Sequence, residues 1–367
     1  MADLSGLRVS LVLATSTGGV GRHVRSLAAG LPAYGAEVTV CGPAATGEMF
    51  ALPETGARFV PVQIGTSPRP VADAAAVRRL AAGLHRADVV HAHGLRAGLL
   101  AGLAARPRTP YVVSWHNALL GTGVRRRAMV VLELLVARRA TVTLAVSADL
   151  ADRVRALGGR DARLLPVPAP PLDPSTQPVA QVRGELGAAD RPLVLAVGRL
   201  HSQKGFPTLI EAASRWADRA PPPLVAIAGE GPAREELAAS IAAGGNAVRL
   251  LGHRSDVASL LAAADVVVLP SRWEGSPLAA QEALSAGRPL VACAVGGVPD
   301  LVGDGAVLVP AGDPAALAAA VSRLLDDPAA AATLAARGVA RASAWADEPA
   351  TVASVAGIYA ELCGRRR

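Results

Sequence analysis

The sequence is poor in aromatic residues, cysteine and long apolar runs. Aromatic residues make up 3% of its 367 residues, so the cores must be built from Ala, Val and Leu, and few rings remain to stack on the bases of a nucleic acid. Cys41, Cys293 and Cys363 have no metal or redox spacing, which favours reduced thiols and a cytoplasmic protein. No apolar run reaches the ~20 residues of a membrane span, and no signal peptide is visible at the start of the sequence.

Two further absences concern charged residues. The chain contains no D-x-D, the carboxylate pair by which a site usually holds a diphosphate through Mg²⁺ or Mn²⁺, so we expect no metal site. Lysine is almost missing, because Lys204 is the sole lysine among 37 Lys and Arg residues. A lysine that survives in such a background suggests a position that needs a compact point charge, such as one beside a crowded phosphate.

The net charge of +7 is distributed unevenly. Residues 1–172 contain 20 Arg and ten acidic residues, a net charge of +10, whereas residues 173–367 carry −3. A basic half can face anionic lipid or a phosphorylated acceptor, and the arginines around the apolar stretch Ala128–Ala137 would suit a membrane surface. The alternative is that arginine decorates an ordinary surface and that this stretch is a core helix.

Apolar β-branched runs alternate with helical Ala/Leu/Arg segments, which is typical of βα units and parallel sheets. Six prolines within Pro166–Pro178 indicate a stiff linker, and we place a domain boundary near Leu172. The predicted domains are residues 1–172 and 173–349, each Rossmann-like. The strand-like runs are Arg8–Ala14, Glu37–Cys41, Phe59–Gln63, Asp88–His91, Tyr111–Trp115 and Val142–Val146 in the first, and Leu193–Val197, Leu224–Ala228, Val248–Leu251, Val266–Leu269, Leu290–Ala292 and Val307–Val309 in the second.

Polar segments follow several strands of the first half. The glycine-rich turn Thr17–His23 opens a helix directly after a strand, where backbone N–H groups can receive an anion. His91, His93 and His116 lie at the ends of two strands, where open parallel sheets bind ligands. We expect His91 and His93 to point to opposite faces of the sheet, which argues against a shared metal ion, and we interpret His116 as a hydrogen-bonding partner for a substrate hydroxyl.

The second half contains the stronger signals. The segment Gly198–Gly205 follows its first strand and contains Arg199 and Lys204, which could grip one pyrophosphate. After the strand Val266–Leu269 come Glu274 and Glu282, which could reach different hydroxyls of one extended ligand. Between them we predict a helix start with Ser276 as N-cap and Pro277 at the first helical position. The structural alternative is an ordinary capped surface helix.

These segments together resemble the retaining glycosyltransferases of family four. The pieces are the early G-G-x-G turn, "VHAHG", "WHN", "VGRLHSQKG", "IAGEGP", "LGHRSDV" and an E-x7-E formed by Glu274 and Glu282, in order from about residue 18 to residue 312. The resemblance implies the GT-B architecture, two Rossmann-like doubly wound parallel-sheet domains facing across a cleft. It also implies metal-independent transfer of a hexose-type sugar from a UDP- or GDP-linked donor, with retention of configuration and no cofactor. A helix at about 350–367 would pack back on the first domain.

The resemblance also implies roles for individual residues. Arg199 and Lys204 would bind the donor diphosphate, helped by the backbone at Gly19. Glu282 would bind the ribose, while Glu274 and His116 would contact the transferred sugar as the catalytic pair. The complete set predicted to bind the donor is Gly19, Arg199, Lys204, His253, Arg254, Gly275, Ser276 and Glu282, with the backbone around His253 and Arg254 holding the base.

Other functions fit the sequence less well. A dinucleotide-dependent dehydrogenase would need G-x-G-x-x-G with an acidic residue some 20 residues on, and the chain lacks it. A GT-B epimerase or a catalytically silent sugar-nucleotide-binding protein is the remaining alternative. Asn117 and Asp300 depart from the family pattern, which often has His-Asp and Pro-Glu at these places. The acceptor, whether lipid, glycan or small molecule, is open, and so is peripheral contact with the inner face of a membrane.

Overall fold

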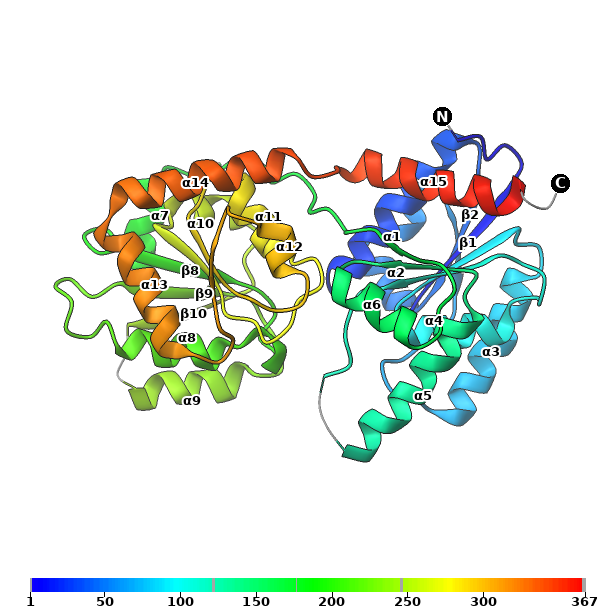
Figure 1. Ribbon diagram of the computed structural model, residues 1–367, viewed down its shortest axis with the longest axis horizontal. Coiled ribbons are helices and arrows are strands. Elements are labelled where there is room, and N and C mark those ends of the chain that lie inside the picture. The colour runs from blue at the N-terminus through cyan, green and yellow to red at the C-terminus, as the bar shows by residue number, and fades with distance from the viewer. Residues whose placement is uncertain (1, 121–122, 176, 245–246, 365–367) are drawn as a thin grey trace. The chain divides into compact units, whose positions relative to one another are not determined.

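A computed structural model describes residues 2–120, 123–175, 177–244 and 247–364, without the side chains of residues 124 and 125. The chain divides into two compact units (Figure 1). Unit 1 contains Met1–Pro168 and the returning segment Ala346–Arg367, and unit 2 contains Ala169–Trp345. The division therefore falls within the proline-rich segment and at a second crossing near residue 345.

Unit 1 is built on a seven-stranded sheet with the order β3-β2-β1-β4-β5-β6-β7, in which all paired strands are parallel. The continuous apolar character of its central strands is explained by burial on both faces, since every residue of β4 and β5 is buried. The strands are β1 (Arg8–Leu13), β2 (Glu37–Gly42), β3 (Arg58–Pro61), β4 (Val89–His93), β5 (Tyr111–Trp115), β6 (Val142–Ala145) and β7 (Ala162–Leu164).

Helices cover both faces of this sheet (Figure 1). The last helix of the chain, α15, packs beside α1, where a Cβ on Gly30 would lie 2.9 Å from Val352. On the other side α4 packs between α3 and α5. The helices are α1 (Gly19–Gly30), α2 (Ala44–Met49), α3 (Pro70–Leu84), α4 (Leu95–Ala104), α5 (Gly123–Arg139), α6 (Ala148–Ala156) and α15 (Glu348–Gly364), with short 3-10 turns η1 (Leu31–Tyr34) and η2 (Leu52–Thr55).

Unit 2 has a six-stranded sheet with the order β10-β9-β8-β11-β12-β13, again with parallel pairing throughout. Its buried residues form two hydrophobic clusters, to which alternate residues of the same strands contribute, as a sheet covered on both faces requires. The strands are β8 (Leu193–Val197), β9 (Leu224–Ala228), β10 (Val248–Gly252), β11 (Val266–Leu269), β12 (Leu290–Cys293) and β13 (Val307–Val309).

The helices of unit 2 form two layers. In one layer α8 packs against α9 and α13, and in the other α7 packs on α10 and α11 on α14 (Figure 1). The helices are α7 (Val179–Leu186), α8 (Phe206–Ser214), α9 (Arg234–Gly244), α10 (Val257–Ala263), α11 (Leu278–Ser285), α12 (Val298–Val302), α13 (Pro314–Asp326) and α14 (Pro328–Ser343), with a 3-10 turn η3 (Ser202–Lys204).

Both sheets reverse their strand order at one point, between β1 and β4 in unit 1 and between β8 and β11 in unit 2. The loops that leave the carboxyl ends of two such strands run to opposite faces of the sheet, so a crevice opens between them and commonly binds the ligand. The predicted doubly wound α/β fold is confirmed, and these two switch points are where the site is expected.

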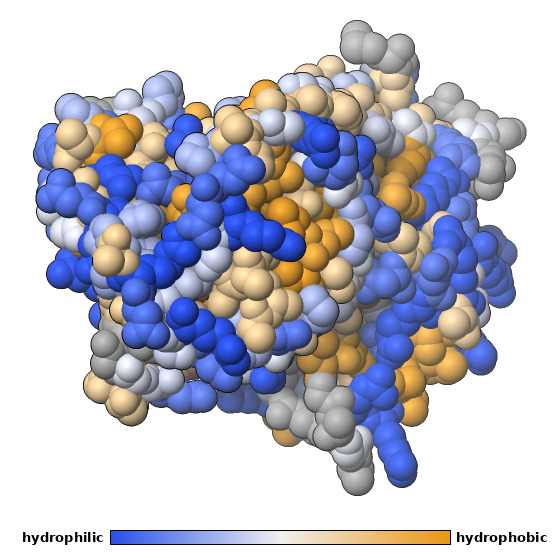
Figure 2. Space-filling view, turned by 60° about the vertical axis from the view of Figure 1, so that its left-hand side comes forward, coloured by the Kyte–Doolittle hydropathy of each residue, from blue (hydrophilic) through white to orange (hydrophobic). Residues whose placement is uncertain are grey.

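Hydrophilic residues cover much of the face shown in Figure 2, with apolar residues gathered in smaller patches. Within the described part of the chain, no helix is both long enough and apolar enough to cross a lipid bilayer.

Candidate active site

Two loops at the switch point of unit 2 carry the predicted donor site. The first follows β8 and contains η3, whose N-cap His201 accepts a hydrogen bond from the backbone N–H of Gln203. The second follows β11. They are joined because the backbone N–H of Arg272 donates to the Gln203 carbonyl at 2.8 Å, and the Gln203 amide donates to the Trp273 carbonyl at 3.0 Å.

Two glycines allow this close approach of backbone. Gly205 has a φ of +64°, and a Cβ there would lie 2.0 Å from the carbonyl oxygen of Pro270. Gly296, after β12, has a φ of +51°, and its Cβ would lie 2.1 Å from the carbonyl oxygen of Glu274. Only glycine both adopts this positive φ readily and lacks the Cβ for which there is no room. These two positions therefore allow the loops to pack closely.

The loops bring Lys204 and Glu274 together. The Lys204 ammonium donates to Oε1 of Glu274 at 2.6 Å, and the Ser271 hydroxyl donates to the same oxygen at 2.6 Å. The Glu274 side chain is 7% exposed and that of Lys204 is 22% exposed. The sole lysine is therefore neutralised by a buried carboxylate in this structure, and an incoming phosphate would have to compete with Glu274 for it.

The helix after this loop begins one residue later than predicted. Pro277 is the N-cap of α11, so the prediction of Ser276 as N-cap with Pro277 at the first helical position is wrong. No described side chain caps this end, and the Ser276 hydroxyl instead accepts a hydrogen bond from the Gln281 amide at 3.0 Å. Gly275 is buried beside Glu274, and Glu282 lies half-buried within α11.

The remaining predicted donor residues of unit 2 lie in loops at the same edge of the sheet. Arg199 lies two residues after the end of β8 and is exposed. His253 and Arg254 follow β10, two strands away. The Arg254 guanidinium forms an ion pair with Asp256 and holds its own loop, which raises the pKa of Arg254 and lowers the pKa of Asp256, mainly through their side-chain hydrogen bond.

In unit 1, the glycine-rich turn opens α1 as predicted. Gly18 is the N-cap and its carbonyl accepts from the backbone N–H of Gly21, which also donates to the Ser16 hydroxyl. Gly19 is the first helical residue and is partly exposed, and a Cβ on Gly18 would meet no atom within 4 Å. The backbone of this turn is therefore open on the side of Gly18.

Four histidines lie together at the switch point of unit 1. His91 and His93 are on β4, His116 directly follows β5, and His23 is on the first turns of α1. The ring centroid of His93 lies 5.5 Å from that of His23 and 5.6 Å from that of His116. The expectation that His91 and His93 face opposite sides of the sheet is wrong, because residues two apart in a strand share a face, and their ring centroids are 4.2 Å apart.

All four imidazoles are buried, with exposed fractions between 0% and 9%. Burial lowers the pKa of His116 to about 3, with a smaller contribution from His23, and lowers the pKa of His23 to about 4. The pKa values of His91 and His93 also fall well below the usual 6.5, first through burial and then through the neighbouring imidazoles. Each ring is therefore neutral at pH 7 and carries one N–H donor and one acceptor nitrogen. Among the described residues, no group of His, Cys, Asp and Glu has the arrangement of a metal site.

Sequence reasoning missed three members of these sites. Ser271, which holds Glu274, is an ordinary serine in sequence terms. His23 belongs to the glycine-rich segment, but nothing in its spacing pointed to the other histidines. Tyr359 of α15 hydrogen-bonds His91 at 2.6 Å, and a contact between residues 268 positions apart leaves no local signal.

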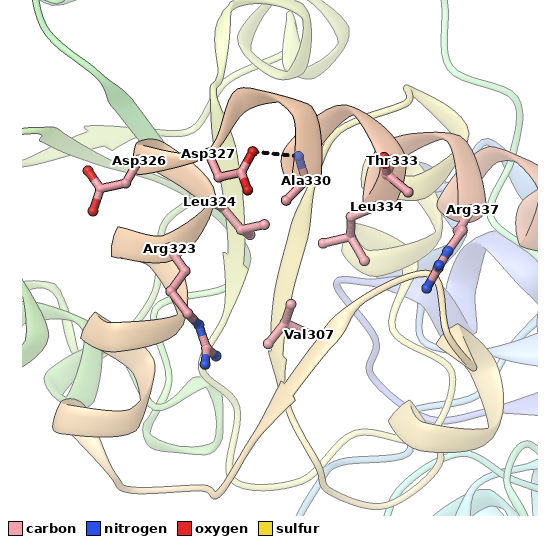
Figure 3. Close-up of a pocket in the computed structure, with 9 residues that line it drawn as sticks. All are labelled: Val307, Arg323, Leu324, Asp326, Asp327, Ala330, Thr333, Leu334 and Arg337. Carbon is pink, nitrogen blue, oxygen red and sulfur yellow. Dashed lines mark hydrogen bonds between the residues drawn. The ribbon is translucent and has the colours of Figure 1, made fainter.

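The groove drawn in Figure 3 lies away from the predicted site. It has a volume of about 650 Å³ and is formed by the start of β13, the end of α13 and the first half of α14. In Figure 3 the side chains of Leu324 and Leu334 lie above Val307, and Arg323 and Arg337 lie to either side of it. These segments are at the amino edge of the sheet, opposite the loops that carry Lys204 and Glu274.

Two family models match most of this chain. Residues 18–170 match the family described as glycosyl transferase 4-like domain, and residues 191–327 match the glycosyl transferases group 1. The D-inositol 3-phosphate glycosyltransferase of Xylanimonas cellulosilytica is 34% identical over 309 residues, which are 76% of this chain and 73% of the relative. The alpha-D-kanosaminyltransferase of Streptomyces kanamyceticus is 38% identical over 189 residues, 50% of this chain and 49% of the relative.

The fold is also shared with solved structures. The crystal structure of Anabaena HepE in complex with UDP matches with a TM-score of 0.81 at 22% sequence identity, over 96% of this chain and 99% of that one. The two parallel α/β units thus have the GT-B fold. The chain spans about half to two thirds of the length of the first curated relatives, 49% and 63%. With both halves matched by family models and with a relative 34% identical over most of its length, the chain belongs to the group 1 glycosyltransferases with a glycosyl transferase 4-like N-terminal domain.

Proposed function

We propose that this protein is a glycosyltransferase that moves a hexose-type sugar from a UDP- or GDP-linked donor to an acceptor, with retention of anomeric configuration. The observation that carries the proposal is the group formed by Lys204, Glu274 and Ser271 at the switch point of unit 2. It provides one cation for a phosphate and one buried carboxylate for a sugar hydroxyl, on loops that glycines allow to pack closely.

The division of roles follows the family resemblance. Lys204 and Arg199 hold the diphosphate, Glu282 the ribose, and Glu274 and His116 the transferred sugar. Gly19, Gly275 and Ser276 offer backbone or hydroxyl groups to the donor, and the backbone around His253 and Arg254 holds the base. The lack of D-x-D supports metal-independent transfer, because Arg199 and Lys204 can neutralise the diphosphate directly.

The donor assignment is tested by calorimetry with UDP and GDP. We expect Lys204→Ala to weaken binding of the preferred nucleotide by roughly 2–4 kcal/mol, since the phosphate loses its charge partner. Arg337→Ala is the matched control, because it removes an exposed cation from the opposite edge of the same unit. If Lys204→Ala binds both nucleotides with the affinity of the unchanged protein, Lys204 does not bind the diphosphate.

Retention and metal independence are tested in one assay. Transfer from the preferred donor is followed by proton NMR, which distinguishes the two anomers of the product. Relatives are named for 2-deoxystreptamine and D-inositol 3-phosphate, so these two compounds are the first acceptors to try. An inverted product would exclude the retaining mechanism. A tenfold loss of rate in EDTA that Mn²⁺ restores would exclude metal independence.

We further propose peripheral contact of the basic unit with anionic lipid. The α5 helix exposes Arg126, Arg127 and Arg138 together with Val131 and Leu135, which are 56% and 51% exposed, so basic and apolar groups share one helix surface. Arg125, also included in this prediction, has no described side chain. Each arginine near an anionic surface contributes ~1 kcal/mol.

Co-sedimentation with vesicles tests this contact. We expect pelleting with phosphatidylserine-containing vesicles at low salt and none with neutral vesicles, and Arg126→Ser/Arg127→Ser should lose most of it while keeping nucleotide affinity. If the unchanged protein does not pellet with anionic vesicles at low salt, the acceptor is to be sought among soluble molecules.

A further inference from the structure

The histidine group of unit 1 has an internal order. His116 is the residue at its open end, with 9% of its surface exposed, and His93 lies behind it at 2%. His93 and His116 belong to neighbouring strands, since His93 pairs in register with Ser114 of β5 and His116 follows β5 directly. Their rings are nearly parallel, with an interplanar angle of 21°.

One hydrogen bond joins the two rings. Nδ1 of His93 lies 3.4 Å from Nε2 of His116, a length that is common for catalytic hydrogen bonds before substrate binds. The other nitrogen of His93, Nε2, is buried without a partner among the described residues. Within the described chain, Nδ1 of His116 makes no hydrogen bond, but unlike Nε2 of His93 it is not fully buried.

This pattern selects one tautomer for each ring. Both imidazoles are neutral at pH 7, so each has a single N–H. If the proton of His93 were on Nε2, a buried N–H would have no acceptor, which is rarer in proteins than a buried acceptor without a donor. The proton therefore belongs on Nδ1 of His93, which donates to Nε2 of His116. His116 must then carry its own proton on Nδ1.

The ring of His93 is itself held in place. His91 packs against it with a centroid distance of 4.2 Å, and His91 is fixed at both nitrogens. Its Nδ1 lies 2.6 Å from the Tyr359 hydroxyl, and its Nε2 lies 2.8 Å from the Ser114 hydroxyl. Hydroxyls can donate or accept, so these bonds hold the orientation of His91 with either tautomer and leave His93 little freedom to rotate.

We propose that His93 is a positioning residue, which fixes His116 as the tautomer protonated on Nδ1 so that His116 offers an N–H donor to a substrate oxygen. The inference rests on the proposed transferase function for the identity of that oxygen, a hydroxyl of the transferred sugar. The hydrogen bond between the two histidines does not depend on that function. Because Nδ1 of His116 would then be a donor and not an acceptor, it could contact only those sugar oxygens that accept a hydrogen bond.

The tautomer is measured directly by long-range ¹H–¹⁵N NMR of the histidine-labelled full chain, with His116→Gln used to assign its signals. We expect His116 to be protonated on Nδ1 at pH 7.5. In His93→Gln the proton should move to Nε2, the tautomer that prevails in free histidine. A wild-type His116 protonated on Nε2 overturns the proposal. This measurement needs no substrate, so a negative result would count against the role of His93 and not against the proposed transferase function.

Two substitutions of similar polarity separate positioning from a structural role. The amide of His93→Asn can occupy the position of Nδ1 and still donate, whereas the amide of His93→Gln reaches the position of Nε2. In UDP release from UDP-glucose without acceptor, we expect His93→Gln to lower kcat about 10–100-fold with KM unchanged, and His93→Asn to recover most of that loss. His85→Asn is the control, since His85 is an exposed histidine of the same unit. Equal kcat losses in His93→Asn and His93→Gln would contradict the proposal.

Discussion

Glu274 and Glu282 hold different positions in unit 2. Glu274 lies in the loop before α11, where Lys204 and Ser271 fix its carboxylate, and Glu282 lies within the helix itself. The Glu274 carboxylate forms an ion pair with Lys204 in the unliganded site, so it competes with a phosphate for that lysine. The Glu282 carboxylate would instead bind the ribose, and so would favour nucleotide binding. The two glutamates should therefore affect nucleotide binding in opposite directions.

This difference gives a prediction for two single substitutions. Glu274→Gln should bind free UDP or GDP at least as tightly as the unchanged protein, while its kcat falls about 100-fold, because its contact with the sugar is made in the transition state. Glu282→Ala should weaken binding of the same nucleotide by roughly 1–3 kcal/mol. Calorimetry and steady-state kinetics measure the two effects. Weaker nucleotide binding in Glu274→Gln would show that the Lys204–Glu274 pair does not compete with the phosphate.

At the residue scale, composition was the most informative part of the sequence. A sole lysine among arginines pointed to Lys204, and the structure places it against Glu274, with which the E-x7-E begins. The sequence could not show that these two residues pair with each other before a ligand binds, because residues 70 positions apart leave no local pattern. The error over His91 and His93 was one of geometry, since strand alternation itself places them on one face.

An ion pair with one buried partner links α5 to α6. Glu133 on α5 is fully buried, and Nε of Arg153 on α6 lies 3.1 and 3.0 Å from its two carboxylate oxygens. Arg153 is 28% exposed, so its charge remains partly solvated while that of Glu133 does not. Removing the arginine leaves a buried carboxylate without its ion-pair partner.

We therefore expect Arg153→Met to lower the free energy of unfolding by about 2–4 kcal/mol, less than for a wholly buried pair. Glu133→Met/Arg153→Met should recover most of this loss, because no charge is left buried. Arg155→Met is the control, since its pair with Asp152 on the same helix is exposed and should change stability by less than ~0.5 kcal/mol. Urea unfolding measures all three, and a double variant as unstable as Arg153→Met would argue against this account.

Element ends were harder to predict than element centres. The strands Tyr111–Trp115, Leu193–Val197, Leu224–Ala228, Val266–Leu269 and Val307–Val309 were predicted with the bounds that the structure gives them. The short edge strand β7 was missed because Ala162–Leu164 contains a charged residue and is nowhere fully buried, so it lacks the apolar run of a central strand. At α11, proline serves as N-cap where serine has the higher preference, since Ser276 is engaged with Gln281 instead.

Across the whole molecule, buried histidines are confined to one unit. His23, His91, His93 and His116 are buried in unit 1, whereas His201 and His253 of unit 2 are exposed. Burial lowers the pKa of His23 to about 4 and of His116 to about 3, and an unfolded histidine has a pKa near 6.5. Below pH 6.5 these histidines bind protons in the unfolded chain but not in folded unit 1, so acid favours unfolding.

The expected result is selective loss of unit 1 stability between pH 6.5 and about 4. Above pH 6.5 these histidines contribute no pH dependence, and below it each can remove up to about 1.4 kcal/mol per pH unit. Trp115 lies in unit 1 and the other three tryptophans in unit 2. Fluorescence during thermal unfolding therefore reports unit 1 in a variant that retains only Trp115, and unit 2 in Trp115→Phe. An equal shift of the unit 2 transition between pH 7 and pH 5 would contradict this explanation.

The overall architecture was predictable from the alternation of apolar runs and helical segments, but the strand order was not. For parallel strands of similar composition, such as β8 and β11, the sequence does not indicate which strands will be neighbours in the sheet. The order places the loops of Lys204 and Glu274 side by side, and the return of α15 to unit 1 places Tyr359 beside His91. Both sites thus depend on long-range packing that local patterns do not record.

The solitary lysine also makes the site its own spectroscopic reporter. Reductive methylation with ¹³C-formaldehyde modifies primary amines and keeps their positive charge. In this chain it would label one side chain, Lys204, and any free amino terminus. A single pair of methyl resonances would then show whether the ammonium faces Glu274 or a phosphate, in a protein of 37.1 kDa that needs no other isotope.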